Sequence, residues 1–475
     1  MKHLSILFCA LLGVFVSHGR AADASVKPNI IFILADDLGY GDLGCYGQAR
    51  IKTPHLDRMA AEGIRFTQAY SGSTVCAPSR CVLMTGRHTG HATVRGNAGQ
   101  QNPLAQSLRA GDTTASGVLK QAGYATALIG KWGLGDAGDA EPGLPRRHGF
   151  DYFFGYLNQH HAHNYYPEFL WRNETKVKLA NVVPDADERG AGMASERREY
   201  THDVFAAEAL KFVRENKRHP FFLYYAVTIP HANNEAKQKG MEVPDLGDYT
   251  DLDWPEPQKG HAAMITRLDC DVGRLFELLK ELGLDRNTLV IFTSDNGPHR
   301  EGGNDPEFNR SSGPLRGIKR AHYEGGIRVP TIARWPGRVP AGKVSDAIWY
   351  FADVLPTLAA LAGAPPPPGI DGVSIVPTLE GRTQPALRDR FLYWEFHEAA
   401  FKQAARWGDW KAVRNHLDDP IELYDLSKDI GETTNLAAQQ PKVVARFEEY
   451  FKTARVDSPD WPVKKGQRRP PATKP

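Results

Sequence analysis

The stretch NIIFILADD, residues 29–37, decides the architecture of this chain. Its apolar run, together with Asn29, predicts a strand over residues 29–34 that is buried on both faces, as in a parallel sheet. The run ends in two aspartates, Asp36 and Asp37. In open α/β sheets, ligands bind outside the carboxyl ends of the strands. The stretch therefore predicts a central sheet strand with a chemically active end.

Short apolar runs followed by turn residues and helical stretches recur along the chain, which is the pattern of a layered α/β domain. Further strands are predicted in ATALIGKWG, ending at Lys131; in FFLYYAVTIPH, ending at His231; in TLVIFTSDNG, ending at Asp295 and Asn296; and in RVPTIARW, starting at Arg328. Helices are predicted in HLDRMAAEG, in TTASGVLKQAG and in ITRLDCDVGRLFELLKELG. Any one strand end collects polar residues because it meets water. Four such ends together favour a shared site.

The composition changes near residue 386. The runs RFLYWEF and AARWGDWKAVRN predict aromatic-rich antiparallel strands with a turn at Gly408–Asp409, and KVVARFEEYFKTA predicts a closing helix. We expect a large α/β domain over residues 25–385, a small C-terminal α+β domain with an antiparallel sheet over residues 386–465, and a flexible basic tail over residues 466–475.

The first residues are typical of a signal peptide. Lys2, an apolar run too short to span a bilayer and a flank of small residues predict cleavage near Ala22, so we expect a signal peptide over residues 1–22 and a periplasmic or extracellular protein without stable membrane insertion. Cleavage removes Lys2 and Arg20, which brings the formal charge from +2 to about zero. Such a balance offers no field that would attract nucleic acid.

The polar strand ends contain a set of oxygen donors. Asp36, Asp37, Asp295 and Asn296 combine carboxylate and amide oxygens, which are the ligands that Ca²⁺ prefers, whereas Zn²⁺ favours His or Cys. Four cysteines remain after export, too few for a disulfide-built scaffold, and none forms a CxxC pair: Cys45, Cys76, Cys81 and Cys270. Cys76 therefore needs another explanation.

The run CAPSRCVLMTGR, residues 76–87, resembles the signature of the sulfatases, members of the alkaline phosphatase superfamily. Every fixed position of that signature is met, by Cys76, Pro78, Ser79, Arg80, Leu83, Thr85, Gly86 and Arg87. The resemblance extends through ADDLGYGDLGCYG, GKWGLG, TIPHAN, TSDNG, LRGIKRAHYEGGIRVP and ELYDLSKDIGETTNLA, over nearly all of the expected mature chain. It implies an alkaline-phosphatase-like large domain.

The resemblance also implies a role for Cys76. In sulfatases a separate maturation enzyme oxidises this cysteine to formylglycine, an aldehyde. One hydroxyl of the hydrated aldehyde attacks sulfur and expels the substrate alcohol, and collapse of the other back to a carbonyl releases sulfate by C–O cleavage. A serine would be trapped as its sulfate ester, because it has no second hydroxyl.

Further roles follow from the same resemblance. Arg80 would hold the aldehyde hydrate, Lys131 and Lys319 would bind the sulfate, and His231 would protonate the departing alkoxide. A Ca²⁺ ion would lie between the modified Cys76 and four ligands, Asp36, Asp37, Asp295 and Asn296.

One position departs from the family pattern. Many sulfatases read Gly-Lys-Trp-His where this chain reads GKWG, with Gly133 in place of the histidine. We hypothesise that a histidine of GYLNQHHAHNYYP, namely His160, His161 or His163, supplies the missing group. The alternative is that this loop only lines the substrate pocket or lies on the surface.

The expected activity is hydrolysis of a sulfate ester on a carbohydrate, because aromatic side chains such as those of HNYYPEFLW stack on sugar rings. Units of the galactose or N-acetylgalactosamine type are the expected substrates. Two alternatives stay open: a phosphate or phosphonate ester hydrolase on the same scaffold, and a catalytically impaired protein that binds sulfated glycans.

Overall fold

The computed structural model describes residues 27–98, 102–398 and 400–463. The predicted signal peptide and the predicted basic tail lie outside these residues. Among the helices described, none has both the length and the apolar character needed to cross a membrane. No disulfide joins the four described cysteines.

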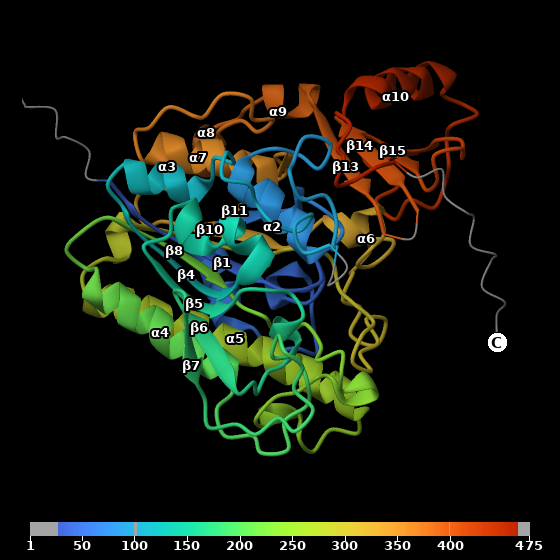
Figure 1. The fold of residues 1–475 in the computed structure, drawn as a ribbon. Helices are drawn as coiled ribbons and strands as arrows, with labels where there is room; N and C mark the ends of the chain where they lie inside the picture. The colour runs from blue at the N-terminus through green and yellow to red at the C-terminus, as the bar shows by residue number, and fades with distance from the viewer. Residues whose placement is uncertain (1–26, 99–101, 399, 464–475) are drawn as a thin grey trace, which may run out of the picture.

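A ten-stranded sheet forms the centre of the molecule (Figure 1). Its strand order is β11-β2-β10-β9-β1-β8-β4-β5-β6-β7, and the five strands from β9 to β5 run parallel. The bounds of these five are Thr288–Ser294 (β9), Asn29–Ala35 (β1), Phe221–Ala226 (β8), Ala125–Lys131 (β4) and Tyr152–Tyr156 (β5). The outer strands are Lys343–Ser345 (β11), Ile64–Phe66 (β2), Thr331–Arg334 (β10), Phe169–Arg172 (β6) and Thr175–Lys178 (β7). A separate pair is formed by Ala69–Tyr70 (β3) and Trp349–Tyr350 (β12).

Two details differ from the simple picture of strands ending in functional residues. Strand β8 ends at Ala226, so His231 lies on the loop that follows rather than at the strand end. Strand β10 pairs antiparallel with β9, and Arg328 precedes it. A reversed strand brings its beginning to the edge where its parallel neighbours end, which keeps Arg328 on the same edge as the other polar residues.

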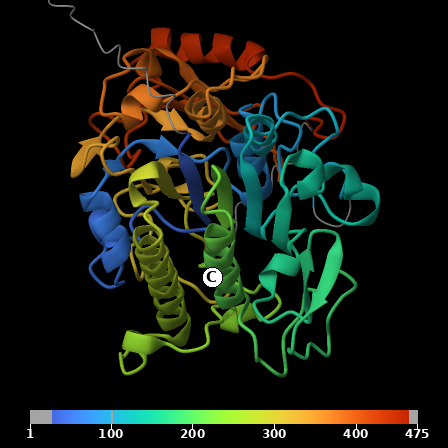
Figure 2. The ribbon, with the colours of Figure 1, turned by 90° about the vertical axis from the view of Figure 1, so that its left-hand side faces the viewer.

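Helices cover both faces of this sheet (Figure 1). One face packs against Cys76–Thr85 (α2), Ala115–Gln121 (α3) and Val354–Leu361 (α7), and the other against Pro54–Ala61 (α1), Thr201–Glu215 (α4) and Glu256–Glu281 (α5). Figure 2 shows α4 and α5 side by side. Strand β1 serves both cores, because Ile30, Phe32 and Leu34 face one and Ile31 and Ile33 face the other. Burial on both faces explains its unbroken apolar run.

Two predicted helices illustrate how local sequence sets helix bounds. Helix α3 begins as predicted after Thr114, whose side-chain oxygen accepts the backbone N–H of Gly117. Helix α5 begins at Glu256, earlier than the predicted run at Ile265, with Pro257 in its first turn. Proline suits the first turn, where its missing N–H leaves no helical bond unmade.

A separate four-stranded antiparallel sheet follows the large domain, as predicted. It contains Phe391–Phe396 (β13), Lys402–Trp407 (β14), Trp410–Arg414 (β15) and Glu422–Asp425 (β16), and Pro441–Thr453 (α10) packs on it. Gly408, at φ 57°, lies in the predicted turn between β14 and β15. The short helices are Glu324–Ile327 (α6), Val376–Leu379 (α8) and Ala386–Asp389 (α9).

Candidate active site

The carboxyl ends of β1 and β9 bring four oxygen-bearing residues together. These strands are parallel neighbours in a register that places Ala35 opposite Ser294. The next residues, Asp36 and Asp37 on one strand and Asp295 and Asn296 on the other, are therefore adjacent. All four are fully buried. The candidate ligand atoms of the three aspartates and of Cys76 lie within 4.8 Å of one another.

Asp37 has an unusual backbone conformation. Its φ of 65° lies in the left-handed region, which aspartate tolerates better than most residues but which still costs about 1 kcal/mol or more. The neighbouring strand holds this turn, because the N–H of Asp37 donates to Asp295 Oδ1 at 3.1 Å and the N–H of Leu38 donates to Ser294 Oγ at 2.8 Å. Backbone strain of this kind concentrates at functional sites.

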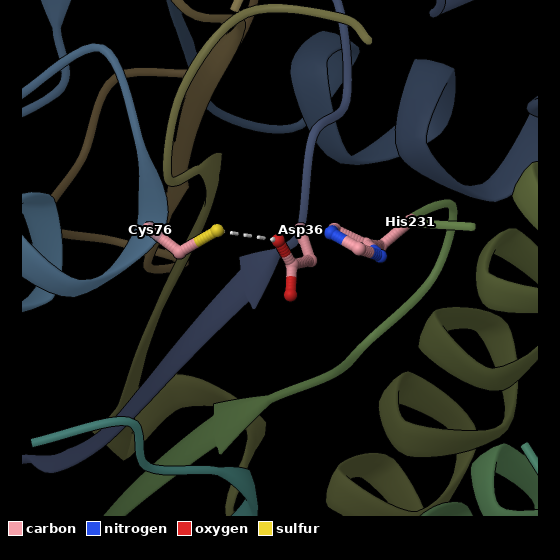
Figure 3. Close-up of side chains that lie close together, drawn as sticks. All are labelled: Asp36, Cys76 and His231. Atoms are coloured by element: carbon pink, nitrogen blue, oxygen red, sulfur yellow. Dashed lines mark hydrogen bonds between the residues drawn. The ribbon is translucent and has the colours of Figure 1, made fainter. Parts of the chain in front are cut away.

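Cys76 is the first residue of α2 and points at the acidic cluster. Its Sγ lies 3.5 Å from Asp36 Oδ1, and Figure 3 shows Asp36 between Cys76 and His231. Burial, reinforced by the charge of Asp36, raises the pKa of the Cys76 thiol well above its ordinary value. A thiol that stays protonated is a poor nucleophile. The position is therefore suited to chemistry other than that of a thiolate.

Arg80, one helical turn after Cys76, braces this cluster from inside the protein. Its Nη2 donates to Asp295 Oδ2 at 2.8 Å, and its Nη1 donates to the carbonyl of Lys131 at 2.8 Å. The guanidinium is fully buried, and Asp36 Oδ2 lies 3.4 Å from Nη2. The contacts that Arg80 makes here are thus with the acidic residues and the end of β4.

Two lysines complete the floor of the site. Lys131 Nζ donates to Asp36 Oδ2 at 2.6 Å, and Lys319 Nζ donates to Asp37 Oδ2 at 2.8 Å. Burial alone would lower the pKa of each lysine, but the nearby acidic groups, led by the facing aspartate, together outweigh it and the pKa is raised. Both lysines are therefore cationic, as binding of an oxyanion requires.

His231 faces the same cluster from the loop after β8. Its Nδ1 donates to the carbonyl of Ala232 at 2.7 Å, which leaves Nε2 facing Lys319 Nζ at 3.3 Å. Burial, together with the charge of Lys319, lowers the pKa of His231 to about 3. Its ring stacks with His163 and His299, at centroid distances of 5.2 and 5.8 Å.

The donor set fits a hard divalent cation. Asn296 Oδ1 is buried without a hydrogen-bond partner among the residues that the structure describes, although its Nδ2 donates to Asp37 Oδ1 at 2.6 Å. Burial, followed by the nearby charge of Asp36, raises the pKa of Asp295. Crowded carboxylates beside a free amide oxygen are the ligands that Ca²⁺ takes. The residues that would hold it are Asp36, Asp37, Asp295 and Asn296, beside Cys76.

A cavity of about 720 Å³ opens above these residues and is lined by Cys76, His231 and Lys319 among others. His160 and His163 also line it, as expected for substrate-binding residues. The structure places His161 elsewhere: its ring is fully buried against Tyr156 and Phe169, outside the cavity lining. A side chain enclosed in the core cannot contact a substrate, so the prediction that His161 binds the substrate is wrong.

The space beside Gly133 is taken by Gln159. A Cβ on Gly133 would lie 2.3 Å from Gln159 Nε2, and its three nearest atoms would all belong to Gln159. Gly133 also has a φ of +78°, which disfavours any other residue. The side chain that occupies this space is thus that of the glutamine preceding His160. The hypothesis that a histidine of this loop supplies the missing group stays a prediction for His160 and His163, which line the cavity.

The sequence analysis missed Glu301. Its carboxylate accepts from Lys319 Nζ at 2.9 Å and from Arg320 Nη1 at 2.6 Å. Burial would raise the pKa of Glu301, but the surrounding basic groups, led by Lys319, together outweigh it and lower the pKa. His299, in the same loop, pairs with the carbonyl of Pro230 at 3.0 Å and so supports the backbone before His231. The only signal for either was nearness to Asn296 in the sequence.

Comparison with known proteins assigns this arrangement to a family. Residues 28–364 match the Sulfatase family, and residues 318–456 match the family described as N-sulphoglucosamine sulphohydrolase, C-terminal. The chain is 35% identical to N-acetylgalactosamine-6-sulfatase of Homo sapiens over 408 residues, which cover 82% of this chain and 72% of the human protein. It is 32% identical to N-acetylgalactosamine-6-O-sulfatase of Bacteroides thetaiotaomicron over an alignment of 527 positions, which covers 96% of this chain and 100% of the Bacteroides protein.

The fold is shared with solved structures of related chains. Ps i-CgsB in complex with k-i-k-neocarrahexaose superposes with a TM-score of 0.76 at 28% identity, covering 92% of this chain and 95% of that chain. The signature at Cys76, the acidic cluster and these matches agree. The chain therefore belongs to the sulfatase family of sulfuric ester hydrolases, within the alkaline phosphatase superfamily.

Proposed function

We propose that this sulfatase is exported and removes sulfate from a carbohydrate, with the 6-sulfate of an N-acetylgalactosamine unit as the first substrate to test. The names of the human and Bacteroides relatives support this sugar, and the neocarrahexaose bound to Ps i-CgsB supports a saccharide more generally. The cavity volume falls within the range of sites that enclose small ligands, about 300–1,000 Å³.

The observation that carries the proposal is the position of Cys76. Its sulfur lies beside the oxygen donors of the acidic cluster and also lines the cavity with Lys319 and His231. A substrate in this cavity would therefore meet the nucleophile position, a cation site and a proton-transferring group at one point.

Two groups that the family uses fit this geometry. Formylglycine, formed from Cys76 by a maturation enzyme, would supply after hydration one hydroxyl to attack sulfur and a second whose deprotonation expels inorganic sulfate. Bound Ca²⁺ would lower the pKa of that nucleophile and neutralise charge on the sulfate oxygens.

The residues of the chain then have separate tasks. Lys131 and Lys319 bind the sulfate oxygens and stabilise the charge that develops on them. Arg80 keeps the acidic cluster in place through Asp295. His231, held by the carbonyl of Ala232, presents an unprotonated Nε2 toward the cavity. The negative charge of a bound sulfate favours protonation of this nitrogen, which then passes that proton to the leaving alcohol oxygen.

Mass spectrometry of the peptide that contains Cys76 tests the modification, and sulfate release tests the reaction. We expect conversion of Cys76 to formylglycine, and faster release from N-acetylgalactosamine 6-sulfate than from the 4-sulfate. A matched pair of sulfate and phosphate esters of one sugar separates the sulfatase from a phosphate ester hydrolase. Preference for the phosphate ester, or binding without any sulfate release by the modified protein, would overturn the proposal.

A further inference from the structure

The lining of the cavity above Cys76 includes the basic side chains of Lys319, Arg320, His160, His163 and Arg189. Lys319 is one of the two lysines proposed to bind the scissile sulfate, and Arg320 and Arg189 have no such assignment. Their pairing decides which of them is available to a substrate.

Four of the five already have carboxylate partners. Lys319 and Arg320 share Glu301, and Arg320 also pairs with Glu398 at 3.3 Å. Each histidine also has an acidic partner. His160 Nε2 lies 2.7 Å from the carboxylate of Asp187, and His163 Nδ1 lies 3.2 Å from that of Glu235.

Arg189 differs from them. Among the residues that the structure describes, its guanidinium makes no ion pair and donates no hydrogen bond, although it lines the cavity. It acts on Asp136 through space, but that carboxylate is not within ion-pair distance and accepts from Asn158 Nδ2 at 2.9 Å. Arg189 is partly exposed, so its charge is available to solvent or to a ligand.

The chain holds Arg189 on a firmly built turn. The carboxylate of Asp187 accepts the backbone N–H groups of Arg189 and Ala191 at 2.9 and 3.0 Å, and it also pairs with His160. Gly190 has a φ of +94°, and a Cβ there would lie 2.6 Å from the ring of His161. The turn is thus fixed against the histidine loop, which gives the buried His161 a supporting role.

We propose that Arg189 binds a second anionic group of the substrate, a sulfate or a carboxylate other than the scissile sulfate, on the same sugar or on its neighbour. The proposal rests on the proposed function and refines it, because it makes the natural substrate a polyanionic saccharide. An arginine fork suits either group, since it donates two parallel hydrogen bonds to a pair of oxygens. Buried or shielded bonds of this charged type are worth roughly a tenfold to hundredfold change in affinity.

The test compares substrates that differ only in the second group. The probes are N-acetylgalactosamine 6-sulfate, the 4,6-disulfate, a glucuronate-linked disaccharide of the 6-sulfate, and the methyl ester of that disaccharide. For Arg189→Ala we expect kcat/KM to fall about tenfold to hundredfold on a probe with a second anion, with most of the change in KM, and to stay within about twofold on the monosulfate and the methyl ester. The disulfate and the glucuronate probes identify which anion is bound.

Two further variants control for general damage. Arg189→Lys keeps the charge without the fork and should retain part of the selectivity. Arg198→Ala removes an exposed arginine, paired with Glu196 at 2.6 Å, from the same part of the chain and should change nothing. Equal losses for Arg189→Ala on all four probes, or no loss on any, would overturn the inference.

Binding measurements separate this inference from the proposed function. The Cys76→Ala protein cannot turn over, so calorimetry with the same four probes reports affinity alone. If the modified wild-type protein releases no sulfate, the proposed function fails. If Cys76→Ala binds the doubly anionic probes no better than the methyl ester, the assignment of Arg189 fails.

Discussion

Two clusters of buried charge lie in different parts of this protein. The catalytic cluster contains Asp36, Asp37 and Asp295 with their lysines and Arg80. The junction cluster joins the two domains: Lys411 of β15 lies 2.8 Å from Glu324 of α6 and 2.9 Å from Glu432. All three of these junction residues have no solvent exposure.

The clusters differ in how the charges are matched. In the junction cluster, Lys411 lies between two carboxylates, and Glu324 also accepts from Tyr70 at 2.6 Å and from Arg328 at 3.1 Å. In the catalytic cluster, three carboxylates from one sheet edge crowd together, the amide oxygen of Asn296 has no hydrogen-bond partner among the described residues, and a cavity opens beside them. Buried charge alone therefore does not mark an active site. Buried charge that lies beside a cavity, and beside an amide oxygen to which no described residue donates a hydrogen bond, does mark one.

The junction cluster also bears on the site. Glu324 follows Lys319 by five residues, and its backbone N–H donates to Glu432 Oε2 at 2.6 Å. The C-terminal domain thus holds the segment that carries Lys319, one of the two lysines proposed to bind sulfate. We expect the two clusters to separate experimentally into one that governs turnover and one that governs stability.

The largest effect should come from Cys76→Ala. It removes the nucleophile position, so sulfate release should fall by at least about 10⁴-fold with little change in thermal stability. The matched control is Cys81→Ala, in the same helix but packed in the apolar core, which should keep most of the turnover. Turnover by Cys76→Ala near the wild-type rate would contradict the assignment of the site.

Removal of the cation should come next. A ligand that binds only the folded protein stabilises it by about 2.7 kcal/mol at a hundred times its Kd, so Ca²⁺ should raise the Tm of chelator-treated protein and restore turnover. Asn296→Ala should weaken this shift in Tm, whereas Lys411→Met should leave it intact. A calcium-induced shift that is equal in wild type and Asn296→Ala would argue against these ligands.

Breaking the junction cluster should affect stability more than chemistry. Lys411→Met leaves the buried Glu432 without its cation and Glu324 with Arg328 alone, and it should cost about 3–5 kcal/mol of unfolding free energy, measured by denaturant titration. Lys428→Met removes an exposed lysine that pairs with Asp425 and should change the stability far less, because solvent screens the pair. Loss of turnover by Lys411→Met without loss of stability would show that the junction acts directly in catalysis.

The smallest effect is expected for Glu301→Gln. The neutral side chain keeps the shape but no longer balances Lys319, so kcat/KM should fall about tenfold on every substrate. Glu301→Asp should restore part of the rate, and Glu307→Gln, an exposed neighbour in the same loop, serves as the control. An unchanged rate for Glu301→Gln would leave Asp37 as the sole partner that orients Lys319.

Much of the fold was readable from local patterns. The apolar run from Ile30 to Leu34 indicates a strand buried on both faces, and Thr114 indicates the start of a helix. Both patterns can be recognised because they depend only on neighbours in sequence. The reversed direction of β10 was not readable, since a short apolar run has the same pattern in either orientation. The early start of α5 was missed because its first turns carry few apolar residues.

The residues of the site also fall into those that the sequence predicted and those that it could not. Residues at strand ends, such as Asp36 and Asp295, could be assembled from sequence because the parallel register brings strand ends together. Glu301, Gln159 and Arg189 could not, because they lie on loops whose course depends on contacts with distant segments. His161 was misplaced for the same reason, since the cavity-lining His160 directly precedes the buried His161 in the chain.

The sequence by itself identified the groups that carry the chemistry. The signature cysteine, the oxygen donors and the two lysines are all local features of the chain. Which charges are balanced and which are left for a ligand was decided only by the tertiary structure. Pairing depends on distances between side chains that are far apart in sequence, and those distances exist only once the sheet, its loops and the small domain have packed together.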